Sequence, residues 1–257
     1  MNVSPEAVLF AEGPARDARF TVRERWIECD NLPGDHPLHL LEFVHRQMNE
    51  EVDSLESSAR SLGDFPMADW AVRMGLARQC ADEARHAMMF RRMLEQRGGR
   101  VGQFPVLNFQ YRIVMARDDL VGRLAVQNRC FEAGGLDAIA FGVGQARAQG
   151  DAELAEFYEA QLADEIVHVR FANDCIREAM RRDPRTVLRI GTALSAAAKA
   201  FRVVMGREGT EGIEYPVDAP ARLEAGFKPD EVQLAAALAV AAHSARLAQG
   251  GAADGAA

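Results

Sequence analysis

Two copies of one eight-residue pattern contain the side chains in this sequence that are best suited to chemistry. The segments 79–86 and 161–168 both read Gln-x-Ala-Asp-Glu-x-x-His. Residues three apart on a helix share a face, so each copy would point a carboxylate and an imidazole in the same direction. Carboxylate oxygens and imidazole nitrogens bind iron and manganese. The repeat therefore predicts two halves of one metal site, formed by two helices that face each other.

A lone glutamate precedes each copy by a nearly equal distance. Glu51-x-x-x-Leu55-Glu56 repeats as Glu132-x-x-x-Leu136-Asp137. Glu51 falls on an inward stripe of the first helix with Leu41, Val44, Met48 and Leu55, whereas Glu50 lies about 100° away from it. A single Glu-x-x-His is usually a solvated helix face, but two copies with matched glutamates favour a dinuclear centre in a four-helix bundle. The predicted metal ligands are Glu51, Glu83, His86, Glu132, Glu165 and His168.

Neighbouring polar residues are expected to support these ligands. Asp82 and Asp164 each precede a ligand glutamate, and we expect each to accept the Nδ1–H of a ligand histidine from the opposing helix. Gln79 and Gln161 lie one turn earlier and should line the cavity or bond a ligand carboxylate.

Two further residues are candidates for contact with a substrate. Asn128 lies one turn before Glu132, so we expect it to face the cavity. Tyr158 lies two turns before Glu165 and could contact substrate or act as a redox-active phenol, although a packed core tyrosine is the favoured interpretation.

The remaining sequence predicts an all-α protein of one domain, residues 1–257. Hydrophobic periodicity and helix-end signals place four long helices at about 35–62, 67–96, 118–149 and 151–182, with 100–116 as the long crossover between two helical hairpins. We therefore expect an N-terminal arm over 1–34, a metal-binding bundle over 35–182, and a disordered tail over 250–257. Within 183–249 we expect two additional helices separated by an irregular excursion over 207–228. Interior glycines at 134, 135, 142 and 144 suggest close helix approach or a local bulge beside the site.

Composition limits the kinds of binding partner and the cellular compartment that we expect for this chain. A net charge of −8 argues against nucleic acid as the main partner, although Arg177, Arg181, Arg182, Arg185 and Arg189 could form a local basic face. Four widely spaced cysteines suit reduced thiols in the cytoplasm. The N-terminus does not resemble a signal peptide, and the longest apolar run, 234–242, is too short to span a bilayer.

With these motifs, the chain resembles the ferritin-like di-iron carboxylate superfamily. The resemblance rests on Glu51, Asp-Glu-Ala-Arg-His at 82–86, Glu132 and Asp-Glu-Ile-Val-His at 164–168, and it covers residues 38–180. More narrowly, the segments 132–137 and 164–168 are similar to a bacterial ferritin-like family of uncharacterised function that is related in motif to di-iron tRNA hydroxylases. Asn49 stands where a histidine would be expected. The resemblance implies two iron ions, with Fe/Mn or Mn/Mn pairs as alternatives.

The function expected from this resemblance is that of a dinuclear iron oxidase or monooxygenase. Such an enzyme would use dioxygen, an unidentified organic substrate and an external electron donor. The alternative is a ferroxidase or iron-handling protein with no organic substrate, and a third interpretation is a metal site that only stabilises the fold. The alanine-rich helix after Pro184 should pack on the bundle or form the face of a homodimer.

Overall fold

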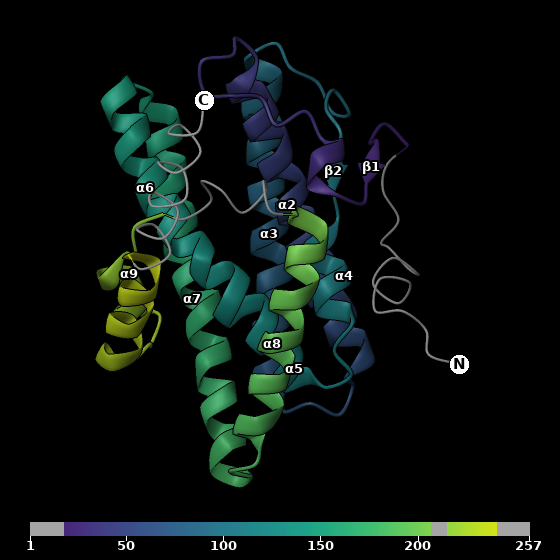
Figure 1. The fold of residues 1–257 in the computed structure, drawn as a ribbon, viewed down its shortest axis with the longest axis vertical. Coiled ribbons are helices and arrows are strands. Elements are labelled where there is room, and N and C mark those ends of the chain that lie inside the picture. The colour runs from purple at the N-terminus through teal and green to yellow at the C-terminus, as the bar shows by residue number, and fades with distance from the viewer. Residues whose placement is uncertain (1–17, 207–214, 241–257) are drawn as a thin grey trace, which may run out of the picture.

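The structure, a computed structural model, describes residues 18–206 and 215–240. Within these residues the chain is helical apart from two short strands, turns and connecting loops (Figure 1). The predicted all-α class is therefore confirmed. Our expectations for residues 1–17, 207–214 and 241–257, including the tail over 250–257, lie outside the described residues. No helix in the described part of the chain combines the length and the apolar character needed to cross a membrane.

The first helical pair is formed by α2 (His39–Asp64) and α3 (Trp70–Gln96), which pack against each other along their length (Figure 1). Both helices begin a few residues later than predicted. The segment around Pro37 forms turns instead, with the Leu38 amide donating to His36 Nδ1. Gly98, with φ of 81°, follows α3 in the left-handed conformation that glycine adopts without steric cost.

The crossover between the two pairs is anchored to the N-terminal arm. Strand β1 (Val22–Arg23) pairs in parallel with β2 (Val106–Leu107), and α4 (Phe109–Met115) then packs against α2. Asn49 on α2 donates a hydrogen bond to the Leu107 carbonyl. Asn49, which stands where we expected a histidine, therefore holds the crossover in place.

The second pair contains a local change of helix type. The predicted helix over 118–149 is divided into α5 (Leu120–Val126), a π-helical segment η2 (Gln127–Glu132) and α6 (Ala133–Gln149), and it packs against α7 (Ala152–Arg182). Of the glycines singled out above, only Gly142 approaches a neighbour, because a Cβ there would lie 3.0 Å from the Tyr158 ring. The expected bulge is present as η2, immediately before the glycines.

The C-terminal helices cover the bundle. In α8 (Thr186–Met205) the buried residues Ala193 and Ala197 pack in one apolar cluster with Val126 and with residues of α4. The alanine stripe thus packs on the bundle, the first of the two arrangements expected for it. Residues 207–228 were predicted to be irregular, but they include α9 (Ala219–Glu224), because Asp218 accepts from the Ala221 amide and caps a short helix. A further helix occupies 229–240.

The buried face of α2 differs from the predicted stripe. Val44, Met48 and Glu51 are buried as expected, but Leu41 and Leu55 are only partly buried. Toward its C-terminus the helix instead buries four hydroxyl side chains, Ser54, Ser57, Ser58 and Ser61. The first half of α2 therefore contributes to an apolar core, whereas the second half faces a polar interior.

His45 joins the arm, the crossover and α2, and it should make the fold sensitive to acid. Its Nε2 accepts from the Gly102 amide at 2.9 Å, and Phe20 and Phe104 pack on its ring. Burial lowers the pKa of His45 to about 4. A histidine in the unfolded chain has a pKa of about 6.5. As the pH falls from about 6.5 to about 4, only the unfolded chain binds a proton at His45, so the free energy of unfolding decreases.

Replacing His45 should reduce this loss of stability at low pH. Urea unfolding of His45→Gln should lose less stability between pH 7 and pH 4 than the wild type does, by on the order of 2–3 kcal/mol. The exposed His36 provides the control, and His36→Gln should follow the wild-type curve. If the free energy of unfolding depended on pH in the same way in His45→Gln and in the wild type, the His45 ring would not be held neutral.

Candidate metal centre

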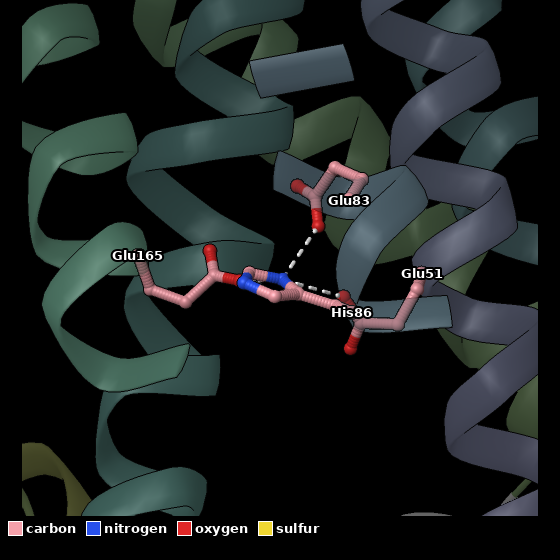
Figure 2. A group of neighbouring side chains, drawn as sticks. All are labelled: Glu51, Glu83, His86 and Glu165. Atoms are coloured by element: carbon pink, nitrogen blue, oxygen red, sulfur yellow. Dashed lines mark hydrogen bonds and ion pairs between the residues drawn. The ribbon is translucent and has the colours of Figure 1, made fainter. Parts of the chain in front are cut away.

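The six predicted ligands meet in the interior between four helical segments. Glu51 comes from α2, Glu83 and His86 from α3, Glu132 from the end of η2, and Glu165 and His168 from α7. All six are buried, and the most exposed, Glu51 and Glu132, are only 8% exposed. Figure 2 shows Glu51, Glu83 and Glu165 directed toward the His86 ring from three helices. Glu50, in contrast, bonds to Gln47 and lies beside Arg46.

The ligand atoms fall into two overlapping groups. One group contains Glu51, Glu83, His86 and Glu165, and the other contains Glu83, Glu132, Glu165 and His168. In each group, one nitrogen or oxygen from every residue lies within 4.8 Å of the others. Glu83 and Glu165 belong to both groups, so the cluster offers two adjoining positions with two carboxylates in common.

The nitrogen of each ring that faces the cluster is Nδ1. His86 Nδ1 lies 3.2 Å from Glu51 Oε2 and 3.4 Å from Glu165 Oε1, and His168 Nδ1 lies 3.2 Å from Glu165 Oε2. The aspartates contact the opposite ring nitrogen. Asp164 Oδ2 lies 3.3 Å from His86 Nε2, and Asp82 Oδ2 lies 3.1 Å from His168 Nε2.

This arrangement corrects one sequence-based expectation. The opposing helices supply the aspartates as predicted, but the nitrogen that they contact is Nε2 and not Nδ1. Each aspartate is one residue, about 100°, away from its ligand glutamate around the helix. It therefore meets the ring at the outer rim of the site, where Nε2 lies.

An exposed arginine connects the two aspartates. Arg85 Nη2 lies 2.9 Å from Asp82 Oδ1 and 2.7 Å from Asp164 Oδ2. Because the Arg85 side chain is 50% exposed, solvent screens these ion pairs and they add little to stability. Their main effect is to hold both carboxylates toward the histidines. Burial alone would raise the pKa of Asp82, but hydrogen bonds with His168 and Arg78 lower it below its ordinary value.

The glutamines bond the lone glutamates across the two helical pairs. Gln161 Nε2 donates to Glu51 Oε1 at 2.8 Å, and Gln79 Nε2 donates to Glu132 Oε1. Of the two roles expected for these glutamines, the structure shows bonding to a predicted ligand carboxylate. Each helical pair thus orients the glutamate of the other.

The Glu132 side of the cluster has additional hydrogen-bond donors that the sequence did not reveal. Ser54 Oγ lies 2.6 Å from Glu83 Oε1 and 2.9 Å from Glu132 Oε1, and Gln127 Nε2 donates to Glu132 Oε1 at 3.0 Å. Ser54 follows Glu51 by three residues, so its spacing could have identified it. Gln127 precedes Glu132 by five residues, and these share a face only because η2 is π-helical.

Asn128 and Tyr158 have the surroundings of structural residues. Asn128 Nδ2 donates to Glu132 Oε2 at 2.8 Å and to Gln79 Oε1 at 3.0 Å, so its amide nitrogen orients a carboxylate. Tyr158 packs against Phe90 and Phe157, and burial raises its pKa above the ordinary value. This is the core position favoured for Tyr158 from the sequence.

In the absence of metal, the cluster compensates its own charge with protons. Burial, with the nearby Glu165 and Glu83, raises the pKa of Glu132 to about 8. Burial also raises the pKa of Glu51. Burial alone would lower the pKa of His168, but interaction with Glu165 raises it to about 10. Protonated side chains therefore take the place that cations would otherwise fill.

The donor set fits a metal pair. Glu83 is 1% exposed, and its Oε2 makes no hydrogen bond with any residue that the structure describes, although His86 Nδ1 lies 3.4 Å away. An anionic oxygen is costly to bury without a partner, and a cation would supply one. The fold and the site thus define an all-α protein with a buried carboxylate–histidine cluster that could hold metal ions.

Comparison with known proteins places the chain in a family. It belongs to the family described as "Protein of unknown function (DUF455)", whose model matches residues 7–233. No curated protein and no solved structure gives a match. The matched segment includes all six residues of the cluster.

Metal binding should release protons from this cluster. At pH 7 the raised pKa values keep Glu132 and His168 protonated, and a divalent metal requires both to be deprotonated. Affinity should therefore increase as the pH rises from 7 toward 8 and above. Calorimetric titration with Zn²⁺ in buffers of different ionisation enthalpy should show at least two protons released per chain, because the pKa of Glu51 is also raised. Glu132→Gln should release about one fewer, and a buffer-independent enthalpy would contradict this expectation.

Proposed function

We propose that this chain binds two divalent metal ions and belongs to the ferritin-like di-iron carboxylate superfamily. The observation that carries the proposal is the pair of overlapping ligand groups that share Glu83 and Glu165. Two metals in these positions would each have one histidine and one unshared glutamate, with the shared carboxylates between them. Four carboxylates balance the charge of two divalent ions, which favours a dinuclear centre over a single ion. The oxygen and nitrogen donors suit iron, and they also suit manganese.

The activity that we propose is oxidation of an organic substrate by dioxygen. Bound ferrous ions would supply the electrons and Lewis acidity for oxygen reduction, and an external donor would have to restore those electrons. The protein itself would hold the ligands through Asp82 and Asp164, orient the lone glutamates through Gln79 and Gln161, and exclude bulk water. The low exposure of the six cluster residues supports this last role.

One observation favours the alternative function of a ferroxidase or iron-handling protein. The cavity that adjoins the cluster, beside Gln127 and Asn128, has a volume of about 10 Å³. This is about the space needed by one water molecule. An organic substrate would therefore require movement of the surrounding helices to reach the cluster on this side, whereas a ferroxidase needs no pocket for an organic molecule. Against a storage role, the segments beyond the bundle are long, and α8 and α9 cover its sides.

The charges at the C-terminal end of α7 support a partner other than nucleic acid. Most of the arginines considered as a basic face lie beside carboxylates. Arg177 is 3.1 Å from Asp174, Arg182 is 2.8 Å from Glu178, and Arg189 is 3.5 Å from Asp183, while Arg181 also pairs with Glu178. These carboxylates reduce the positive potential that a phosphate backbone would need.

Variants that lack a shared ligand and variants that lack an unshared ligand should bind different numbers of metal ions. Glu83→Ala and Glu165→Ala should lose both metals, because each removes a ligand from both groups. Glu51→Ala should retain about one metal per chain, since it affects a single group. Glu50→Ala is the matched control and should retain the wild-type content. Metal analysis after expression with iron measures this, and full content in Glu83→Ala would overturn the ligand assignment.

Reaction with oxygen separates the proposed function from its alternatives. The iron-loaded protein would be reduced without air and mixed with oxygenated buffer in a stopped-flow spectrometer. An absorbing transient, together with oxygen consumption that an organic compound stimulates, supports the oxygenase proposal. Continuous oxidation of added ferrous iron without an organic product supports a ferroxidase. Bound iron that does not react with oxygen would indicate a metal site that only stabilises the fold.

A further inference from the structure

A row of serines on α2 extends away from the cluster through the protein interior. Ser54, Ser57, Ser58 and Ser61 are between 1% and 6% exposed. Their spacing of three and four residues places them on one helix face. Buried hydroxyl groups are unfavourable unless they are hydrogen-bonded, so four of them on one face require an explanation.

Three of these serines line a cavity about the size of one water molecule. It has a volume of about 10 Å³ and is bounded by Ser57, Ser58, Ser61, Leu76, Val114, Arg123, Leu124, Gln127 and Asn128. Four buried polar atoms of these residues have no hydrogen-bond partner among the described residues: Ser57 Oγ, Ser58 Oγ, Gln127 Oε1 and Asn128 Oδ1. A buried water molecule typically makes two to four hydrogen bonds, so these atoms provide enough partners for one.

Polar groups connect this cavity to the cluster on one side and to the surface on the other. Toward the cluster, Gln127 and Asn128 donate their amide hydrogens to Glu132. Toward the surface, Arg123 Nη1 lies 3.4 Å from Ser61 Oγ, and Arg123 Nη2 lies 2.8 Å from Asp64 Oδ2. The Asp64 side chain is 29% exposed, so the row of polar groups reaches solvent.

The shape of this route restricts what it can carry. Arg123, paired with Asp64, lies at the outer end, and Leu76, Val114 and Leu124 complete the wall of a space too small for organic molecules. The opposite half of the cluster is different, because His86 there packs against Phe157, which in turn contacts Phe90. The His86 half therefore lies beside aromatic side chains, whereas the Glu132 half lies beside the cavity.

We propose that the cavity binds one water molecule and that this water completes a route for water exchange between the surface at Asp64–Arg123 and the Glu132 side of the cluster. The water site rests on the unpartnered polar atoms and is independent of metal binding. If the proposed oxygen-activating function also holds, the same route would remove product water from the Glu132–His168 half, a role that rests on that function.

Ser58→Val tests the inference by filling the cavity and removing one hydroxyl. Ala59→Val is the matched control, because residue 59 is the exposed neighbour on the same helix and the substitution introduces the same side chain at no smaller helix-propensity cost. The full-length chain would be studied twice, metal-free and loaded with diamagnetic Zn²⁺. A high-resolution crystal structure should show a water within hydrogen-bond distance of the four atoms in the wild type and in Ala59→Val, and its loss in Ser58→Val.

Side-chain amide exchange measures the route itself. Exchange of the Asn128 and Gln127 side-chain amide hydrogens with solvent, followed by NMR, should slow by about tenfold in Ser58→Val, the factor expected for losing one hydrogen bond of the path. Ala59→Val should exchange at the wild-type rate. A dry cavity in the wild type overturns the water site, even if Ser58→Val fails to fold. Unchanged exchange in a folded Ser58→Val overturns the route. The same results in metal-free protein separate this inference from the proposed metal function.

Discussion

Four carboxylates buried at one point between helices are the constraint on which the rest of this structure depends. Glu51, Glu83, Glu132 and Glu165 cannot all remain charged and unpaired in a low-dielectric interior. Two imidazoles, three glutamine amides, an asparagine amide and a serine hydroxyl lie against them. The centre is therefore stabilised by bound protons or by metal ions, and this requirement explains why so many polar side chains occupy the interior.

The two copies of the sequence repeat contact each other reciprocally in the structure. Each helical pair supplies an aspartate for the histidine of the other pair and a glutamine for its lone glutamate. Because the two histidines and the two lone glutamates are contacted from the opposite pair, the two pairs must be correctly aligned for the cluster to form. Arg85 strengthens this alignment at the outer rim, where it contacts both aspartates. Such reciprocal support is how a preorganised site limits the motion of its ligands.

The two halves of the site nevertheless differ in their surroundings. The half with Glu51 and His86 lies beside a packed aromatic group that includes Phe157, whereas the half with Glu132 lies beside serines and amides. The π-helical segment η2 produces much of this difference, because it brings both Gln127 and Asn128 to Glu132. The two positions in the cluster are therefore chemically distinct, one beside aromatic rings and one beside polar side chains.

The sequence by itself determined the helical class, the approximate helix limits and the six residues that gather in the interior. It could do so because a helix has a fixed period, so the spacing within each octad sets which side chains share a face. Only the tertiary structure decided which histidine nitrogen faces the cluster, since this depends on the angle between helices. The interior glycines indicated a bulge beside the site, but only the structure placed it at 127–132 and gave it π-helical form. Tertiary packing also decided that Ser54 bonds Glu83 on the neighbouring helix and that Asn49 holds the crossover. These partners come from segments distant in the chain, and local periodicity does not identify them.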